Sequence, residues 1–186
     1  MSQYSHPNLI SSHISFIDRS ELCIVMPLID AGSLLDVINN SFKNGIDDEA
    51  VIATILKSVL QGLDYLHRNG EIHRDIKAGN MFADSDGNIF LGDFGVSANL
   101  KKGEKRKTFV GSPCWMAPEV IEQHSGYDFS ADIWSIGITA IELAEGEAPN
   151  MGMPAMKIVI SIINNDPPTL RHPSRFSKEF RNFIEL

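Results

Sequence analysis

The longest regular pattern in the sequence is helical and runs from about Asp48 to Asn69. Asp47 or Asp48 can cap the start of this segment, and Gly70 supplies a stop signal at its end. Its apolar positions recur with the 3.6-residue period of a single helix face: Ile52, Ile55, Leu56, Val59, Leu63 and Leu66. The pattern predicts a long helix with one face packed against a core.

A second long helix is predicted from Ser130 or Asp132 to a stop at Gly146, and it is apolar along most of its length. Three shorter helices are expected over residues 34–38, where Ser33 is the cap, over 154–164 and over 178–184.

Short strands are predicted in two pairs. Residues 9–17 and 22–26 are apolar and are separated by the charged turn 18–21, which indicates an antiparallel hairpin. Residues 81–82 and 89–91 flank a second turn. Because short strands come first and helices follow, instead of alternating with them, the pattern predicts an α+β fold.

Composition limits the classes of partner. The 186 residues are enough for about one domain, and 16 basic against 24 acidic residues give a net charge of −8, which argues against a nucleic-acid or anionic-membrane binder. No apolar run approaches the ~20 residues of a membrane span. Cys23 and Cys114 are far apart and lack a CxxC pairing, so they read as reduced thiols. We therefore expect a cytoplasmic protein with neither a membrane nor a nucleic-acid partner.

Three short motifs carry the chemistry. His73-Arg74-Asp75-Ile76-Lys77-Ala78-Gly79-Asn80 directly follows the long helix, and Asp93-Phe94-Gly95 and Ala117-Pro118-Glu119 come after it. Any one of these residues alone would more often be a helix cap or part of a surface turn. The probability that all three motifs occur in this order by chance is negligible. On these residues the chain resembles the eukaryotic protein kinases through nearly its whole length.

The resemblance implies ATP and Mg²⁺ as cofactors and assigns roles to four residues. Asp75 would accept or orient the proton of the substrate hydroxyl, and Lys77 would pair with the γ-phosphate. Asn80 and Asp93 would hold Mg²⁺ as hard oxygen donors, with Gly95 permitting the turn that aims Asp93. Phe94 and His73 would form an apolar pair beneath the site.

Nucleotide contacts are expected in the segment that links the hairpin to the helices. Met26 would be the gatekeeper, and the Pro27 carbonyl and the Ile29 N–H would hold adenine. Phe82 stands where a Leu usually floors the adenine pocket. Ser33 completes the expected nucleotide-binding set.

The acceptor class and the regulation are also implied by the resemblance. Lys77, two residues after Asp75, is typical of serine/threonine kinases, so we expect protein substrates with Ser or Thr acceptors. Ser112 and Trp115 are the expected substrate-binding residues. The basic run 101–107 ends at Thr108, where an upstream activating kinase would add a phosphate that docks on Arg74.

Longer stretches point to one group of kinases. Residues 109–120 and 126–144 look like the sterile-20-like group, and 165–168 together with the opening of the chain are most similar to its germinal-centre branch of Fray, SPAK and oxidative-stress-responsive kinases. That branch suggests a stress or signalling cascade.

The resemblance also implies a layout. Residues 1–26 would be a remnant of the kinase N-lobe, a helix tail and the last two strands of its sheet. Residues 27–32 would be the hinge, and 33–186 a mostly helical C-lobe that ends early. No Gly-x-Gly-x-x-Gly occurs in the 186 residues, and no N-lobe Lys can be assigned.

Three functions fit these observations. The first is a serine/threonine kinase, and the second is a catalytically impaired kinase-like fragment that acts as a binding module. The third, a small-molecule phosphotransferase, is disfavoured by Ala117-Pro118-Glu119, which belongs to a peptide-docking surface. Because two strands alone are marginal in water, we also expect the hairpin to expose apolar surface.

Overall fold

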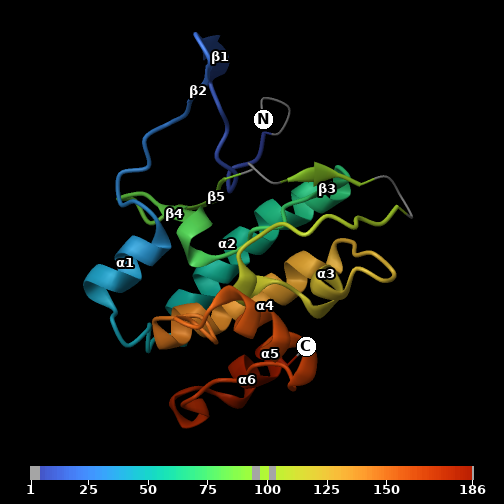
Figure 1. The fold of residues 1–186 in the computed structure, drawn as a ribbon. Coiled ribbons are helices and arrows are strands. Elements are labelled where there is room, and N and C mark those ends of the chain that lie inside the picture. The colour runs from blue at the N-terminus through green and yellow to red at the C-terminus, as the bar shows by residue number, and fades with distance from the viewer. Residues whose placement is uncertain (1–4, 94–96, 101–103, 186) are drawn as a thin grey trace.

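A computed structural model describes residues 5–93, 97–100 and 104–185. A body of helices carries two short strand pairs on its upper side, and a third pair, the N-terminal hairpin, projects away from it (Figure 1). The described helices and strands confirm the α+β fold class, with helices dominating after the hairpin.

Five of the six helices among the described residues were predicted, the first of them only as far as residue 38, and the short helix over 118–122 was not predicted. The six are α1 (Leu34–Ser41), α2 (Glu49–Arg68), α3 (Pro118–Glu122), α4 (Ser130–Glu145), α5 (Ala155–Asn164) and α6 (Lys178–Ile184). Three 3₁₀ turns join them: η1 (Ala78–Asn80), η2 (Pro113–Trp115) and η3 (Pro173–Arg175).

The strands form three separate antiparallel pairs, β1–β2, β4–β5 and β3–β6. Their bounds are β1 (Ile14–Asp18), β2 (Glu21–Val25), β3 (Glu71–Ile72), β4 (Met81–Ala83), β5 (Ile89–Leu91) and β6 (Ala98–Asn99). The β3–β6 pair was not predicted, since two residues per strand leave no alternation to read.

Local chemistry explains where α1 and α2 begin. Ser33 and Asp36 form a capping box, in which each side chain bonds the other residue's backbone N–H. Asp48 accepts a hydrogen bond from the Ala50 N–H at 2.9 Å and so caps α2. Gly70, just past the end of α2, has φ +76°, a conformation that favours glycine.

The main core lies between α2 and α4. The most deeply buried apolar side chains on these two helices are Ile52, Val59 and Leu66 from α2 and Ala140, Leu143 and Ala144 from α4, all at 0% exposure. The spacing on α2 is the one that the sequence pattern predicted. These two helices therefore form the support on which the loops above them rest (Figure 1).

Helix α4 begins at Ser130, which is one of the two predicted starts. Phe129 occupies the cap position without a side-chain hydrogen bond, and Asp128 accepts from the Ser130 N–H at 3.0 Å. Asp132 is fully buried within the first turn. Its carboxylate accepts hydrogen bonds from a neighbouring loop.

The first predicted strand is split in the structure. Only Ile14–Asp18 pairs with β2, whereas Leu9 is buried and bridges Leu91 of β5. Two backbone bonds hold this contact, Ile10 N–H to the Leu91 carbonyl at 2.9 Å and Leu91 N–H to the Asn8 carbonyl at 2.8 Å. Burial of Leu9 in the main core is the physical reason for the split.

The hairpin exposes its apolar side chains, as expected. Ile14 is 57%, Ile17 75% and Leu22 67% exposed. No helix in the described part of the chain is both long and apolar enough to span a bilayer.

Candidate active site

The loop between β3 and β4, residues 73–80, is held from below by Asp132 of α4. The Asp132 carboxylate accepts from the backbone N–H groups of His73 at 2.9 Å and Arg74 at 2.8 Å, and from His67 Nε2 at 2.7 Å. Arg74 takes φ +72°, a strained conformation for a residue with a side chain. The loop therefore keeps its shape through a buried carboxylate that sequence reasoning did not assign to it.

His73 ties this loop to the end of β5. Its side chain is fully buried, and Nε2 donates to the Gly92 carbonyl at 3.0 Å. Nδ1 accepts from the Asp75 N–H at 3.3 Å, which fits a neutral ring. Burial lowers the pKa of His73, in keeping with that state. Its expected partner Phe94, and Gly95, lie outside the described residues.

Asp75 is at the centre of a cluster of hydrogen bonds. Oδ1 accepts from the Ser112 N–H at 3.0 Å and from Ser112 Oγ at 2.8 Å. Oδ2 accepts from Lys77 Nζ at 2.8 Å and from Asn80 Nδ2 at 2.9 Å. Lys77 Nζ also donates to Ser112 Oγ at 2.7 Å. The structure thus brings together four residues that the sequence singled out.

These contacts decide the protonation state of Asp75. Burial of the carboxylate disfavours its charged form, but hydrogen bonds from Lys77, Ser112 and Asn80 and the charge of Lys77 outweigh it. The pKa of Asp75 consequently lies below its ordinary value. Asp75 is therefore an ionised carboxylate at neutral pH, able to accept a hydrogen bond from a further donor.

Asn80 and Asp93 lie on neighbouring strand ends. The Gly92 N–H donates to the Asn80 carbonyl at 2.9 Å, which places Asp93 next to this residue, and Asp93 has φ +57°. Asn80 Nδ2 is committed to two Asp75 oxygens, at 2.7 and 2.9 Å, so its amide oxygen is the atom turned toward other ligands. One amide and one carboxylate oxygen suit Mg²⁺, which takes most of its ligands from phosphates and water. Among the described residues no group of three or more His, Cys, Asp or Glu side chains converges as a metal site.

The predicted hinge runs beside β4. Ala31 N–H donates to the Ala83 carbonyl at 3.1 Å, and Ala83 N–H donates to the Gly32 carbonyl at 3.0 Å. Phe82, half-buried, faces Ser33 across an isolated bridge. Met26 and Pro27 are exposed, and Ile29 is half-buried. Residues 31–33 and 82–83, which are far apart in the sequence, therefore lie side by side.

Ser33, which the sequence predicted both as a helix cap and as a nucleotide contact, caps α1. Its residue is 8% exposed, and Oγ donates to Asp36 Oδ2 at 2.5 Å while accepting from the Asp36 N–H at 3.1 Å. The hydroxyl is used in capping α1, which confirms the predicted cap, and the nucleotide contact of Ser33 stays a prediction.

Trp115, predicted as a substrate-binding residue, packs against α4. It is 9% exposed, and its indole N–H donates to Glu142 Oε2 at 3.0 Å. Ser135 Oγ holds the Trp115 carbonyl at 2.7 Å. A ring of this size is stabilised by burial, so Trp115 has a packing role, and its contact with substrate stays a prediction.

Arg74 and Thr108, which the sequence paired, are in contact. Arg74 Nη1 donates to Thr108 Oγ1 at 2.9 Å, and Nη2 donates to the Ser97 carbonyl at 3.2 Å. Tyr127 Oη donates to the Thr108 carbonyl at 2.9 Å. Thr108 itself is exposed. Part of the basic run, residues 101–103, lies outside the described residues.

Three residues of this site were missed from the sequence: Asp132, Ser135 and Glu142. All three lie on α4, which was predicted only as an apolar helix. A signal was present, because two acidic residues interrupt a largely apolar run at positions where a buried charge needs partners. Which partners they meet could not be read from the helix alone.

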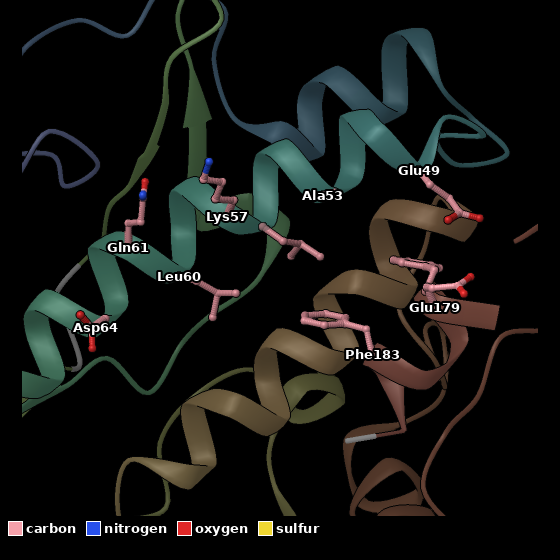
Figure 2. A pocket seen from close by; sticks show the side chains of 10 residues that line it. Glu49, Ala53, Lys57, Leu60, Gln61, Asp64, Glu179 and Phe183 are labelled. Atoms are coloured by element: carbon pink, nitrogen blue, oxygen red, sulfur yellow. The ribbon is translucent and has the colours of Figure 1, made fainter. Parts of the chain in front are cut away.

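A separate apolar groove of about 560 Å³ lies between α2 and α6. Leu60 of α2 and Phe183 of α6 stand on its opposite walls, with Glu49 and Glu179 at one end (Figure 2). None of the residues that the sequence assigned to the site lines this groove.

Comparison with known proteins agrees with the geometry. The family described as "Protein kinase domain" matches residues 1–186. "Germinal center kinase 3" of Caenorhabditis elegans is 48% identical over 198 residues, covering 98% of this chain and 33% of that protein.

Two Dictyostelium discoideum proteins are also similar. "Serine/threonine-protein kinase fray2" is 49% identical over 189 residues (100% of this chain, 18% of that protein), and "Serine/threonine-protein kinase fray1" is 45% identical over 173 residues (92% and 30%). This chain spans between 18% and 33% of the length of these three relatives. With these matches the expected resemblance is confirmed, and the chain belongs to the protein kinase domain family, with sterile-20-like germinal-centre and Fray kinases among its relatives.

Proposed function

We propose that this chain contributes the catalytic loop of a serine/threonine protein kinase, which transfers the γ-phosphoryl group of ATP to Ser or Thr hydroxyls of proteins. The observation that carries the proposal is the Asp75 carboxylate, held through both oxygens by Lys77, Asn80 and Ser112 at 2.8–3.0 Å. Such an arrangement holds an ionised base at a fixed position, which is the main requirement of phosphoryl transfer.

In this mechanism Asp75 accepts or orients the proton of the acceptor hydroxyl. A positioned general base contributes about 10²–10⁴-fold to a rate. Lys77, already within 2.8 Å of Asp75, places a positive charge where the phosphoryl oxygens would lie. Asn80 and Asp93 would hold Mg²⁺, which compensates phosphate charge when it is bound. Met26, Pro27, Ile29 and Phe82 remain the proposed adenine contacts.

The contact between Lys77 and Ser112 supports a Ser or Thr acceptor. Both residues touch Asp75 and each other, so they border the position of the acceptor hydroxyl from two sides. We place the activity in a cytoplasmic signalling cascade, by analogy with the sterile-20-like relatives.

We also propose that Thr108 is a phosphorylation site for an upstream kinase. A phosphate there adds about −1.5 to −2 charge, and the Arg74 guanidinium already lies 2.9 Å from the Thr108 hydroxyl. The phosphate would strengthen the link between the segment carrying Ser112 and the loop carrying Asp75. Thr108→Ala should prevent activation by the upstream kinase, and full activity of this variant under activating conditions would contradict the switch.

The function is tested by phosphate transfer from radiolabelled ATP to matched peptides that differ only in a Ser, Thr or Tyr acceptor. The assay uses the 186-residue chain and the same chain joined to the N-terminal lobe of the C. elegans relative. We expect transfer to Ser and Thr that falls about 10²–10⁴-fold in Asp75→Asn. The matched control is Asp64→Asn, an exposed change on α2 far from the loop. Equal turnover by Asp75→Asn and wild type would overturn the proposal.

The second candidate is a binding module of impaired catalytic power. The observation that favours it is the exposed apolar hairpin, with Ile17 at 75% and Leu22 at 67% exposure. If the lobe-joined protein binds ATP but transfers no phosphate to any acceptor, this candidate replaces the first.

A further inference from the structure

Helix α4 carries a buried polar stripe beneath the site. Asp132, Ser135 and Glu142 lie on one side of the helix, and each bonds a loop above it. Asp132 and Ser135 each hold one segment, the catalytic loop and the segment after Ser112 respectively. Glu142 differs from both, because it bonds the two segments at once.

A single carboxylate oxygen of Glu142 joins the catalytic loop to the segment after Ser112. Oε2 accepts from the Ala78 N–H at 3.0 Å and from the Trp115 indole N–H at 3.0 Å. Ala78 follows Lys77 directly, and the Trp115 N–H donates to the Ser112 carbonyl at 3.0 Å across η2. Lys77 Nζ also donates to Ser112 Oγ. The contacts therefore form a closed circuit from Glu142 through Ala78, Lys77, Ser112 and Trp115 back to Glu142.

We propose that Glu142 is a positioning residue, which fixes the separation between the catalytic loop and the Ser112 segment and thereby keeps Lys77 and Ser112 on Asp75. The kinetic consequence rests on the proposed function, whereas the bridge itself does not. The residue is 1% exposed, so the carboxylate makes both bonds in a position sheltered from solvent. Loss of the bridge leaves the indole N–H and the Ala78 N–H buried together without an acceptor.

The titration of Glu142 makes the bridge measurable. Burial raises the pKa of this carboxyl to about 7, against the lowering influence of the Ala78 and Trp115 hydrogen bonds and of the Lys77 charge. Cys114 is also close, since Glu142 helps to raise the pKa of that thiol. Other charged or titratable side chains share a cavity with Glu142: Lys43, Glu145, Glu147, Arg171, His172 and Arg175. Glu145 and Glu147 are paired with Arg171, which leaves Lys77 as the cation that acts on Glu142 from the site.

The bridge can be followed without turnover, through the indole N–H resonances of the full chain in proton–nitrogen correlation spectra. The chain has two tryptophans, Trp115 and Trp134, and the Trp134 indole nitrogen is buried without a partner among the described residues, so it is an internal reference. We expect the Trp115 resonance to move downfield with rising pH, with a midpoint near 7. In Glu142→Gln the bond persists and the titration disappears.

Two further variants complete the design. Glu142→Leu should move the Trp115 resonance to the position of an unbonded indole at every pH. Glu145→Gln, the same kind of change one turn along α4, should leave the Trp115 titration in place, because Glu145 bonds Arg171 and the His172 N–H instead. A Trp115 resonance that neither titrates nor responds to Glu142→Leu would overturn the proposal.

Kinetics then tests the consequence for catalysis. Glu142→Leu should lower kcat by up to about 100-fold with little change in KM for ATP, and Glu142→Gln should restore most of it and remove a pH dependence near 7 that wild type shows. Any titration of the nucleotide affects wild type and Glu142→Gln alike, so it cancels when their pH profiles are compared. A purely structural role would lower Tm in both variants without altering the pH profile, and that result would count against positioning. If wild type transfers no phosphate, the proposed function fails while the resonance test still decides the bridge.

Discussion

The hairpin β1–β2 and helix α4 are both rich in Ile, Leu and Val or Ala, yet they lie at opposite extremes of burial. On the hairpin, Ile17 is 75% and Leu22 67% exposed, whereas Ile141 and Leu143 of α4 are 1% and 0% exposed. The hairpin satisfies its backbone within itself and packs its side chains on little else. Helix α4 holds loops through buried polar groups. The difference teaches that similar composition can give either a rigid support or an unpartnered surface, according to what packs against it.

The largest effect is expected from removing Asp132. Asp132→Ala leaves the N–H groups of His73 and Arg74 and the His67 ring without their buried acceptor. The free energy of unfolding should fall by about 3–5 kcal/mol, as measured by denaturant titration. Asp64→Ala, which breaks an exposed pair with Arg68, should change it by less than about 1 kcal/mol. Equal effects of the two changes would show that α4 does not support the loop.

A matched pair of leucines compares the two regions directly. Leu63→Ala on α2, at 1% exposure, should lower the free energy of unfolding by about 2–5 kcal/mol. Leu22→Ala on the hairpin, at 67% exposure, should change it by about 0.5 kcal/mol or less. Thermal or urea unfolding measures both. A large loss in the hairpin variant would mean that this region is packed in solution.

The pH dependence of stability sharpens the same contrast within α4. The pKa of Glu142 is raised from 4.5 to about 7, so the folded state binds its proton more tightly than the unfolded state. The stabilisation is present below pH 4.5 and is lost as pH rises toward 7. The loss should be roughly 3 kcal/mol relative to Glu142→Gln, measured by unfolding at several pH values. A constant difference between the two proteins would contradict the buried position of this carboxyl.

The smallest change in stability is expected from charging the hairpin. Ile17→Lys with Leu22→Lys places two cations on side chains that face solvent. Surface changes of this kind alter stability by about 0.5 kcal/mol or less, but they should raise the concentration at which the chain stays monodisperse in light scattering. The matched control is Lys57→Leu on α2. Unchanged association of the charged variant would show that the hairpin does not drive it.

Local patterns in the sequence predicted the elements that depend on local interactions. Ser33 was identified as a cap, Asp48 was one of two candidates for the cap of α2, and the 3.6-residue period gave α2 to within a residue at each end. The Asp75, Lys77, Asn80 and Ser112 set could be chosen because the kinase motifs are specific in order and spacing. Their contacts are partly local too, since Lys77 and Asn80 follow Asp75 within five residues.

Contacts between distant segments could not be predicted in this way. Leu9 pairs with Leu91, and β3 pairs with β6, across long stretches of chain. Trp115 is buried and bonded to Glu142 of α4, a contact that the sequence did not predict. In each case a residue type allowed two environments, and the packing of other elements chose between them.

The sequence by itself determined which residues begin and end the helices and which side chains carry the chemistry, because hydrogen bonds within one helical turn and the spacing of motifs are properties of neighbouring residues. Only the tertiary structure decided that Asp132 and Glu142 would be the supports of the site. A buried carboxylate is stable only where donors meet it, and those donors come from His73, Ala78 and Trp115, which reach α4 only when the whole chain has folded.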